Sequence, residues 1–141
     1  MRMGRLSVML AFAAVGTPVL AEQTFGETCT GTEIVQIGAQ NPKTLPYNLT
    51  FSADLKGRAY CYGPCGKDQS FQITDAAAVP IRLADLDNAG QVRRLTFDPR
   101  TSTVSDYQVF KAGMAVVTRR ASATCEKSVF HAPSPQNHQP H

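Results

Sequence analysis

The sequence predicts an all-β fold, a meander of about eight antiparallel strands that follows a cleaved signal peptide. Apolar and polar side chains alternate along short segments, as where Leu95 and Phe97 alternate with Arg94 and Thr96. Such alternation is typical of half-buried strands. Aspartate-led turn signals separate these segments, and no window of about ten residues shows a helical period. We expect the meander to close into an up-and-down barrel, with a β-sandwich as the alternative.

The first strands and turns can be assigned in order. Strands are expected at residues 33–37 and 47–53, where side chains alternate between apolar and polar. Residues 54–57, Asp-Leu-Lys-Gly, are the clearest turn signal. Aspartate can start such a turn, and glycine adopts the left-handed conformation that a bulged hairpin needs. Residues 58–62 then return as the partner strand.

The second half of the chain repeats this pattern. Aspartate leads turns at residues 87–90 and 98–102, where its side chain can bond to the backbone two residues on. One helical turn is expected at residues 75–78, capped by Thr74 or Asp75. The strands predicted in this half lie at residues 71–73, 81–84, 91–98, 103–110 and 114–124.

Residues 1–21 have the features of a secretory signal peptide. Arg2 and Arg5 form a basic start, residues 6–15 are apolar, and residues 19–21 are small or aliphatic, as a cleavage site requires. The apolar run is shorter than the roughly 20 residues of a permanent membrane span. We therefore expect no stable membrane anchor and a location in the bacterial periplasm or outside the cell.

The rest of the chain is expected to form a single β domain at residues 22–130 and a disordered tail at residues 131–141. The tail is rich in proline and polar residues. The signal peptide holds two of the 14 basic residues and none of the 11 acidic ones, which leaves 12 basic against 11 acidic. This balance gives no electrostatic footprint for nucleic acid.

The four cysteines all follow the signal peptide: Cys29, Cys61, Cys65 and Cys125. An even number in an exported chain predicts two disulfides, and three pairings are open. We favour Cys29–Cys125, which joins the segment before the first strand to the segment after the last, with Cys61–Cys65 closing a tight loop. By loop entropy the long bridge stabilises by about 4–5 kcal/mol and the short one by less.

The segment Cys61-Tyr62-Gly63-Pro64-Cys65 resembles the thioredoxin active site, because Gly-Pro precedes a cysteine. It has three residues between the cysteines rather than two. A polar loop follows in place of the helix whose N-terminus lowers a thiol pKa. A structural disulfide is therefore favoured, with a thiol–disulfide redox protein that uses Cys61 and Cys65 as the alternative.

The histidines, His131, His138 and His141, all lie in the predicted tail. Residues 22–130 therefore lack the side chain that most often acts as a general base for a serine or cysteine nucleophile. They also lack the imidazole ligands of a catalytic zinc. We predict no catalytic residue, no metal site and no cofactor, and hence a protein that is not an enzyme.

Arginine pairs give the candidate ligand-binding residues. Neighbouring residues of a strand point to opposite faces, so Arg93 shares a face with Leu95, and Arg119 shares one with Val117. These side chains either extend to solvent at a strand end or form an interior cationic site. The second hypothesis names Arg93 and Arg119 as residues that bind a small anion or an acidic side chain of a partner.

The predicted function is that of an exported, non-enzymatic β domain that binds a small anionic ligand or an envelope protein. Residues 57–60, Gly-Arg-Ala-Tyr, are loosely similar to the Ser-Gly-containing loop of periplasmic lysozyme inhibitors, which are also small, exported, disulfide-bonded β-barrels. The resemblance implies a further alternative: an inhibitor of a cell-wall hydrolase such as lysozyme, with a loop that enters the enzyme's cleft.

Overall fold

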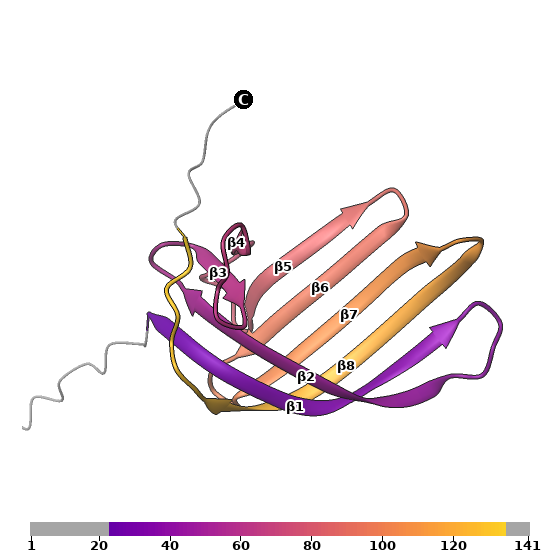
Figure 1. The fold of residues 1–141 in the computed structure, drawn as a ribbon, viewed down its shortest axis with the longest axis horizontal. Helices are drawn as coiled ribbons and strands as arrows, with labels where there is room; N and C mark the ends of the chain where they lie inside the picture. The colour runs from indigo at the N-terminus through magenta and orange to yellow at the C-terminus, as the bar shows by residue number, and fades with distance from the viewer. Residues whose placement is uncertain (1–22, 135–141) are drawn as a thin grey trace, which may run out of the picture.

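The computed structural model describes residues 23–134, which form eight antiparallel strands and no helix (Figure 1). The strand order is β4-β3-β2-β1-β8-β7-β6-β5, so β1 and β8 pair and the meander wraps into a nearly closed barrel. The all-β meander is thus confirmed, in its barrel form. The strands are β1 (Thr24–Ile37), β2 (Lys43–Asp54), β3 (Ala59–Tyr62), β4 (Ser70–Gln72), β5 (Ile81–Asn88), β6 (Gln91–Asp98), β7 (Thr103–Ala112) and β8 (Ala115–Lys127).

The barrel is joined between β4 and β5 by a short bridge rather than a full ladder. The Thr74 amide donates to the Leu83 carbonyl at 3.2 Å, and Asp75 and Arg82 exchange backbone hydrogen bonds of 3.0 and 3.1 Å. The helical turn predicted at residues 75–78 is wrong. Asp75 does accept hydrogen bonds from the amides of Ala77 and Ala78 as a capping residue would, but its backbone pairs with β5 and no helical turn follows it.

The strands surround the barrel axis completely at one end, where β3 and β4 lie, and leave a gap in the circumference at the other. The strands β3 and β4 are only four and three residues long, and β3 pairs with no more than the last four residues of β2. Figure 1 shows both short strands at one end, whereas the β1–β2, β5–β6 and β7–β8 hairpins extend to the other. We call the barrel end with β3 and β4 the closed half and the end with the three hairpin tips the open half.

The hydrophobic core lies in the closed half. Phe97 packs edge-to-face against Phe25 and Phe51, with ring centroids 5.4 and 5.3 Å apart, a favourable geometry for aromatic pairs. On the inner face of the open half, by contrast, Ile37 and Leu86 keep about two-fifths of their surface exposed, at 41% and 39%. The concave face of the open half is therefore partly exposed to solvent.

The first strand is longer than predicted. β1 starts at Thr24, and β2 and β8 pair with it along most of its length. Phe25, Glu27 and Cys29 alternate inward in its first part, where a buried glutamate interrupts the apolar pattern that marks a strand. Long-range pairing, not local composition, forms this segment of β1.

The described residues leave out most of the two chain ends. The predicted signal peptide lies outside the described residues, as do residues 135–141 of the predicted tail. The first residues of that tail, 131–134, follow a defined path along the barrel. Among residues 23–134 there is no helix long and apolar enough to cross a membrane.

Candidate functional site

The disulfide Cys29–Cys125 links the two strands that close the meander. Both pairings that the sequence favoured are present. The expected positions of Cys29 and Cys125 are corrected, because the residues lie within β1 and β8 and face each other directly, with Cα atoms 3.9 Å apart. Two disulfides are characteristic of proteins that fold in an oxidising compartment.

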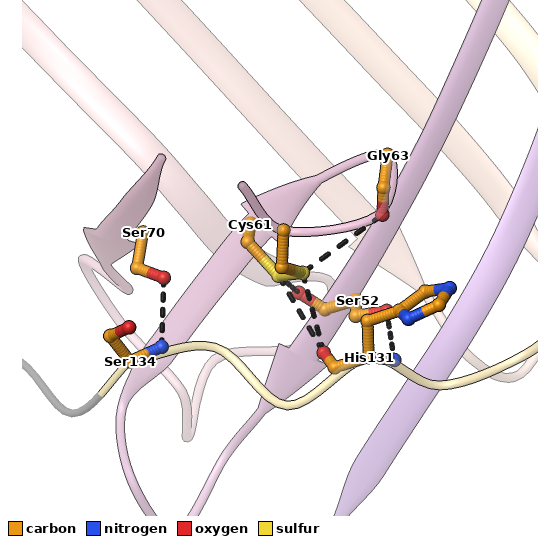
Figure 2. The surroundings of a disulfide bond; sticks show 7 residues. Ser52, Cys61, Gly63, Ser70, His131 and Ser134 are labelled. Atoms are coloured by element: carbon orange, nitrogen blue, oxygen red, sulfur yellow. Dashed lines mark hydrogen bonds between the residues drawn. A yellow bond between two sulfur atoms is a disulfide. The ribbon is translucent and has the colours of Figure 1, made fainter. Parts of the chain in front are cut away.

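The second disulfide, Cys61–Cys65, lies beneath residues 128–134, which we call the C-terminal strap (Figure 2). The His131 amide donates to Ser52 Oγ at 3.0 Å, and the His131 carbonyl oxygen lies 3.6 and 3.4 Å from the two sulfurs. Cys61 is fully buried, whereas Cys65 is partly exposed.

Three polar side chains lie side by side on the concave face of the open half. In the strand register, Arg93 of β6 is opposite Gln108 of β7, and Gln108 is opposite Arg119 of β8. Directly opposed residues of neighbouring strands share a face. Each lies two residues from a buried side chain of its own strand, Leu95, Asp106 or Ala121, so all three point inward. We call Arg93, Gln108 and Arg119 the arginine row.

Two buried carboxylates occupy the next inward positions from this row toward the closed half. Arg119 donates to Glu33 from Nε at 3.0 Å and from Nη2 at 2.8 and 2.7 Å. Arg93 Nη2 donates to Asp106 Oδ2 at 3.2 Å. The side chains of Glu33 and Asp106 are 7% and 2% exposed. Such charge-assisted bonds satisfy carboxylates that would otherwise be costly to bury.

Asp106 is also the centre of a wider polar cluster. Tyr47 Oη and Gln108 Nε2 donate to its Oδ2 at 2.8 and 3.3 Å. The Arg93 guanidinium lies over the Tyr62 ring, 5.5 Å from its centroid. Among the described residues Asp106 Oδ1, Arg93 Nε and Tyr62 Oη are buried without a hydrogen-bond partner. This cluster separates the apolar core from the open half.

The environment of the cluster changes the acidity of its members. Burial and the Asp106 carboxylate raise the pKa of Tyr47 well above its ordinary value. Burial and the nearby Tyr62 raise the pKa of Tyr60 in the same direction. Hydrogen bonds to Glu33 raise the pKa of Arg119. The cluster therefore favours neutral phenols and charged arginines.

These shifts predict loss of stability in alkali. Because the phenols of Tyr47 and Tyr60 have a higher pKa folded than unfolded, their contribution is complete below pH about 10 and is lost as the pH rises, by about 1.4 kcal/mol per pH unit for each. Tyr47→Phe should reduce that slope. Urea unfolding at several alkaline pH values measures it, and a slope that Tyr47→Phe leaves unchanged would contradict the assignment.

Sequence reasoning placed the two arginines but missed their partners. Arg93 and Arg119 do point to the apolar side of their strands, as alternation required. Glu33 and Asp106 were not recognised, although each shares a strand face with apolar residues in the same way. A carboxylate on an apolar strand face is a signal for a buried ion pair, but its partner depends on the register.

A separate pocket lies at the closed end of the barrel. We call it the end pocket, and its volume is about 490 Å³. Its wall combines the core aromatic residues Phe25 and Phe97 with the loop at residues 76–79. Nothing in the sequence marks it, because its wall comes from five separate segments. Within residues 23–134, no group of three histidine, cysteine or carboxylate side chains is placed to hold a metal ion.

The segment that resembles the inhibitor loop is a tight turn and a buried strand. The Gly57 amide donates to Asp54 Oδ1 at 3.0 Å, and Arg58 adopts a positive φ of 52°. Ala59 and Tyr60 are buried in β3, 2% and 4% exposed. Of these four residues, Gly57 and Arg58 alone are placed at the surface.

No family model matches the chain, and no curated protein or solved structure matches it significantly. The fold and the two candidate sites therefore carry the functional argument.

Proposed function

We propose that this protein is an exported, non-enzymatic binding domain that recognises a small carboxylate ligand on the concave face of its open half. The arginine row carries the proposal, because it sets two guanidinium groups and an amide side by side on three neighbouring strands. The disulfides and the predicted signal peptide support the bacterial periplasm or the exterior as the compartment.

The exposure of the charges favours an anion over a cation. The Arg93 and Arg119 side chains are 27% and 35% exposed, whereas their carboxylate partners are almost completely buried. A ligand that approaches from the open half meets the guanidinium groups first. Planar guanidinium groups match a carboxylate geometrically.

Each guanidinium keeps donors for a ligand. Glu33 accepts from Nε and Nη2 of Arg119, and Asp106 accepts from Nη2 of Arg93. Among the described residues, Nη1 of neither arginine donates a hydrogen bond. Phe110 and Val117 occupy the next inward position along β7 and β8, so a ligand with a short apolar part beside its carboxylate fits best.

Benzoate, with benzyl alcohol as its uncharged counterpart, tests this proposal. Glu33→Gln removes the buried charge that competes for Arg119 and should increase benzoate affinity by about three- to ten-fold. The double variant Glu33→Gln with Arg119→Gln should lose that gain. Titration followed by calorimetry or NMR measures both.

Arg120→Gln is the matched control. Arg120 is the next residue on β8 and lies on the outer face, with its guanidinium 4.6 Å from the Tyr107 ring centroid. Its replacement changes the net charge as Arg119→Gln does and should leave benzoate binding unchanged. Equal effects of the two arginine substitutions, or equal binding of benzyl alcohol, would overturn the proposal.

A further inference from the structure

We propose that the end pocket is a second binding site, for an uncharged and mainly apolar small molecule with a single hydroxyl or carbonyl group. This site is independent of the arginine row, since it lies at the opposite end of the barrel. Its volume, about 490 Å³, is in the range of about 300–1,000 Å³ that small-molecule sites occupy.

Apolar side chains form most of the wall. Phe25, Phe97 and Ile81 supply the base from the barrel core, and each is at most 7% exposed. Leu55 and the loop at residues 76–79, Ala-Ala-Ala-Val, form the sides. Val79 in that loop is 60% exposed. An apolar ligand would cover this side chain and gain the free energy of removing it from water.

The loop that forms this wall is held in place without a ligand. Asp75 Oδ1 accepts hydrogen bonds from the amides of Ala77 and Ala78, both at 3.0 Å. The backbone of Asp75 is itself bonded to Arg82 in β5. The loop is therefore anchored to the barrel, and a ligand need not order it, which favours affinity.

The charges around the pocket indicate a neutral ligand. Lys127 of β8 is directly opposite Glu27 of β1 in the register. Arg100 donates to both carboxylate oxygens of Asp98, at 3.1 and 3.0 Å. Positive and negative charges thus balance. A charged ligand would lose its hydration on entering the pocket and would find no unpaired charge of opposite sign there. Ser102 is the neutral hydroxyl among the lining residues, which suits one polar group on the ligand.

Three probes that share an eight-carbon alkyl chain and differ in charge test this inference: 1-octanol, octanoate and octylammonium. Calorimetric titration of the purified chain should give binding of 1-octanol that is at least ten-fold tighter than that of either charged probe. Failure of 1-octanol to bind, or preference for a charged probe, would overturn the inference.

Variants locate the binding. Ala78→Phe puts a large ring into the pocket and should weaken 1-octanol binding at least ten-fold, whereas Ala89→Phe, in the β5–β6 turn of the open half, should not. Val79→Ser changes an exposed side chain, is expected to fold normally, and should weaken binding several-fold. Arg119→Gln should leave 1-octanol binding intact. Unchanged binding in Ala78→Phe and Val79→Ser would rule out this pocket.

Discussion

Asp106→Ala is expected to destabilise the fold by about 3–5 kcal/mol. The Asp106 side chain is 2% exposed and accepts hydrogen bonds from Tyr47, Arg93 and Gln108. Its removal leaves the Arg93 charge without its partner and two neutral donors without an acceptor. Uncompensated polar groups of this kind carry most of the cost. Urea denaturation followed by circular dichroism measures the change in the free energy of unfolding.

Asp85→Ala is the matched control for this prediction. The Asp85 side chain is 33% exposed, and its carboxylate lies 3.9 and 3.7 Å from the guanidinium nitrogens of Arg82 and Arg94. Exposed pairs contribute about 0–1 kcal/mol because water screens them, so this variant should be nearly neutral. Similar costs for the two aspartates would show that burial and hydrogen bonding at Asp106 do not matter as argued.

The arginine row shows how far local sequence determines a site. Alternation along a strand is a local property, so the sequence places Arg93 and Arg119 on the apolar sides of their strands. Whether they meet depends on the register between β6, β7 and β8, and a shift of one residue would turn one of them outward. Glu33 and Asp106 follow the same rule. The four side chains could be predicted singly, but their pairing could not.

The open half of the barrel, like the arginine row, depends on how distant strands pair. Turn signals led by aspartate predicted the β2–β3, β5–β6 and β6–β7 hairpins, and Gly90, with φ of 86°, forms one such turn. The short strands β3 and β4 were expected at residues 58–62 and 71–73, whereas β1 and β2 extend well beyond the residues 33–37 and 47–53 expected for them. Strand length depends on what the strand pairs with, and β1 is long because it lies between two long partners. The accessible concave face is a consequence of this inequality.

The closed and open halves therefore have different physical roles. The aromatic core and the Cys29–Cys125 disulfide hold the closed half together. The polar cluster around Asp106 lies between that core and the open half. Rigid support below and accessible guanidinium groups above are what a preorganised binding face requires.

Loss of the Cys29–Cys125 disulfide is expected to have an effect as large as loss of Asp106. The double variant Cys29→Ala with Cys125→Ala should lower the free energy of unfolding by about 4–5 kcal/mol. The bond joins residues 96 positions apart, so it removes many conformations from the unfolded chain. Both residues belong to the core, and the smaller alanine side chains also leave space there.

The double variant Cys61→Ala with Cys65→Ala provides the comparison. Its bond spans four positions, and a loop that short corresponds to about 2 kcal/mol. The sulfurs of this bond contact the His131 carbonyl of the C-terminal strap, and Cys61 Sγ also contacts the Ser52 carbonyl. Urea denaturation of both double variants therefore should rank the long bridge above the short one by about 2–3 kcal/mol. Equal losses, or the reverse order, would mean that loop closure does not govern how these bonds stabilise the barrel.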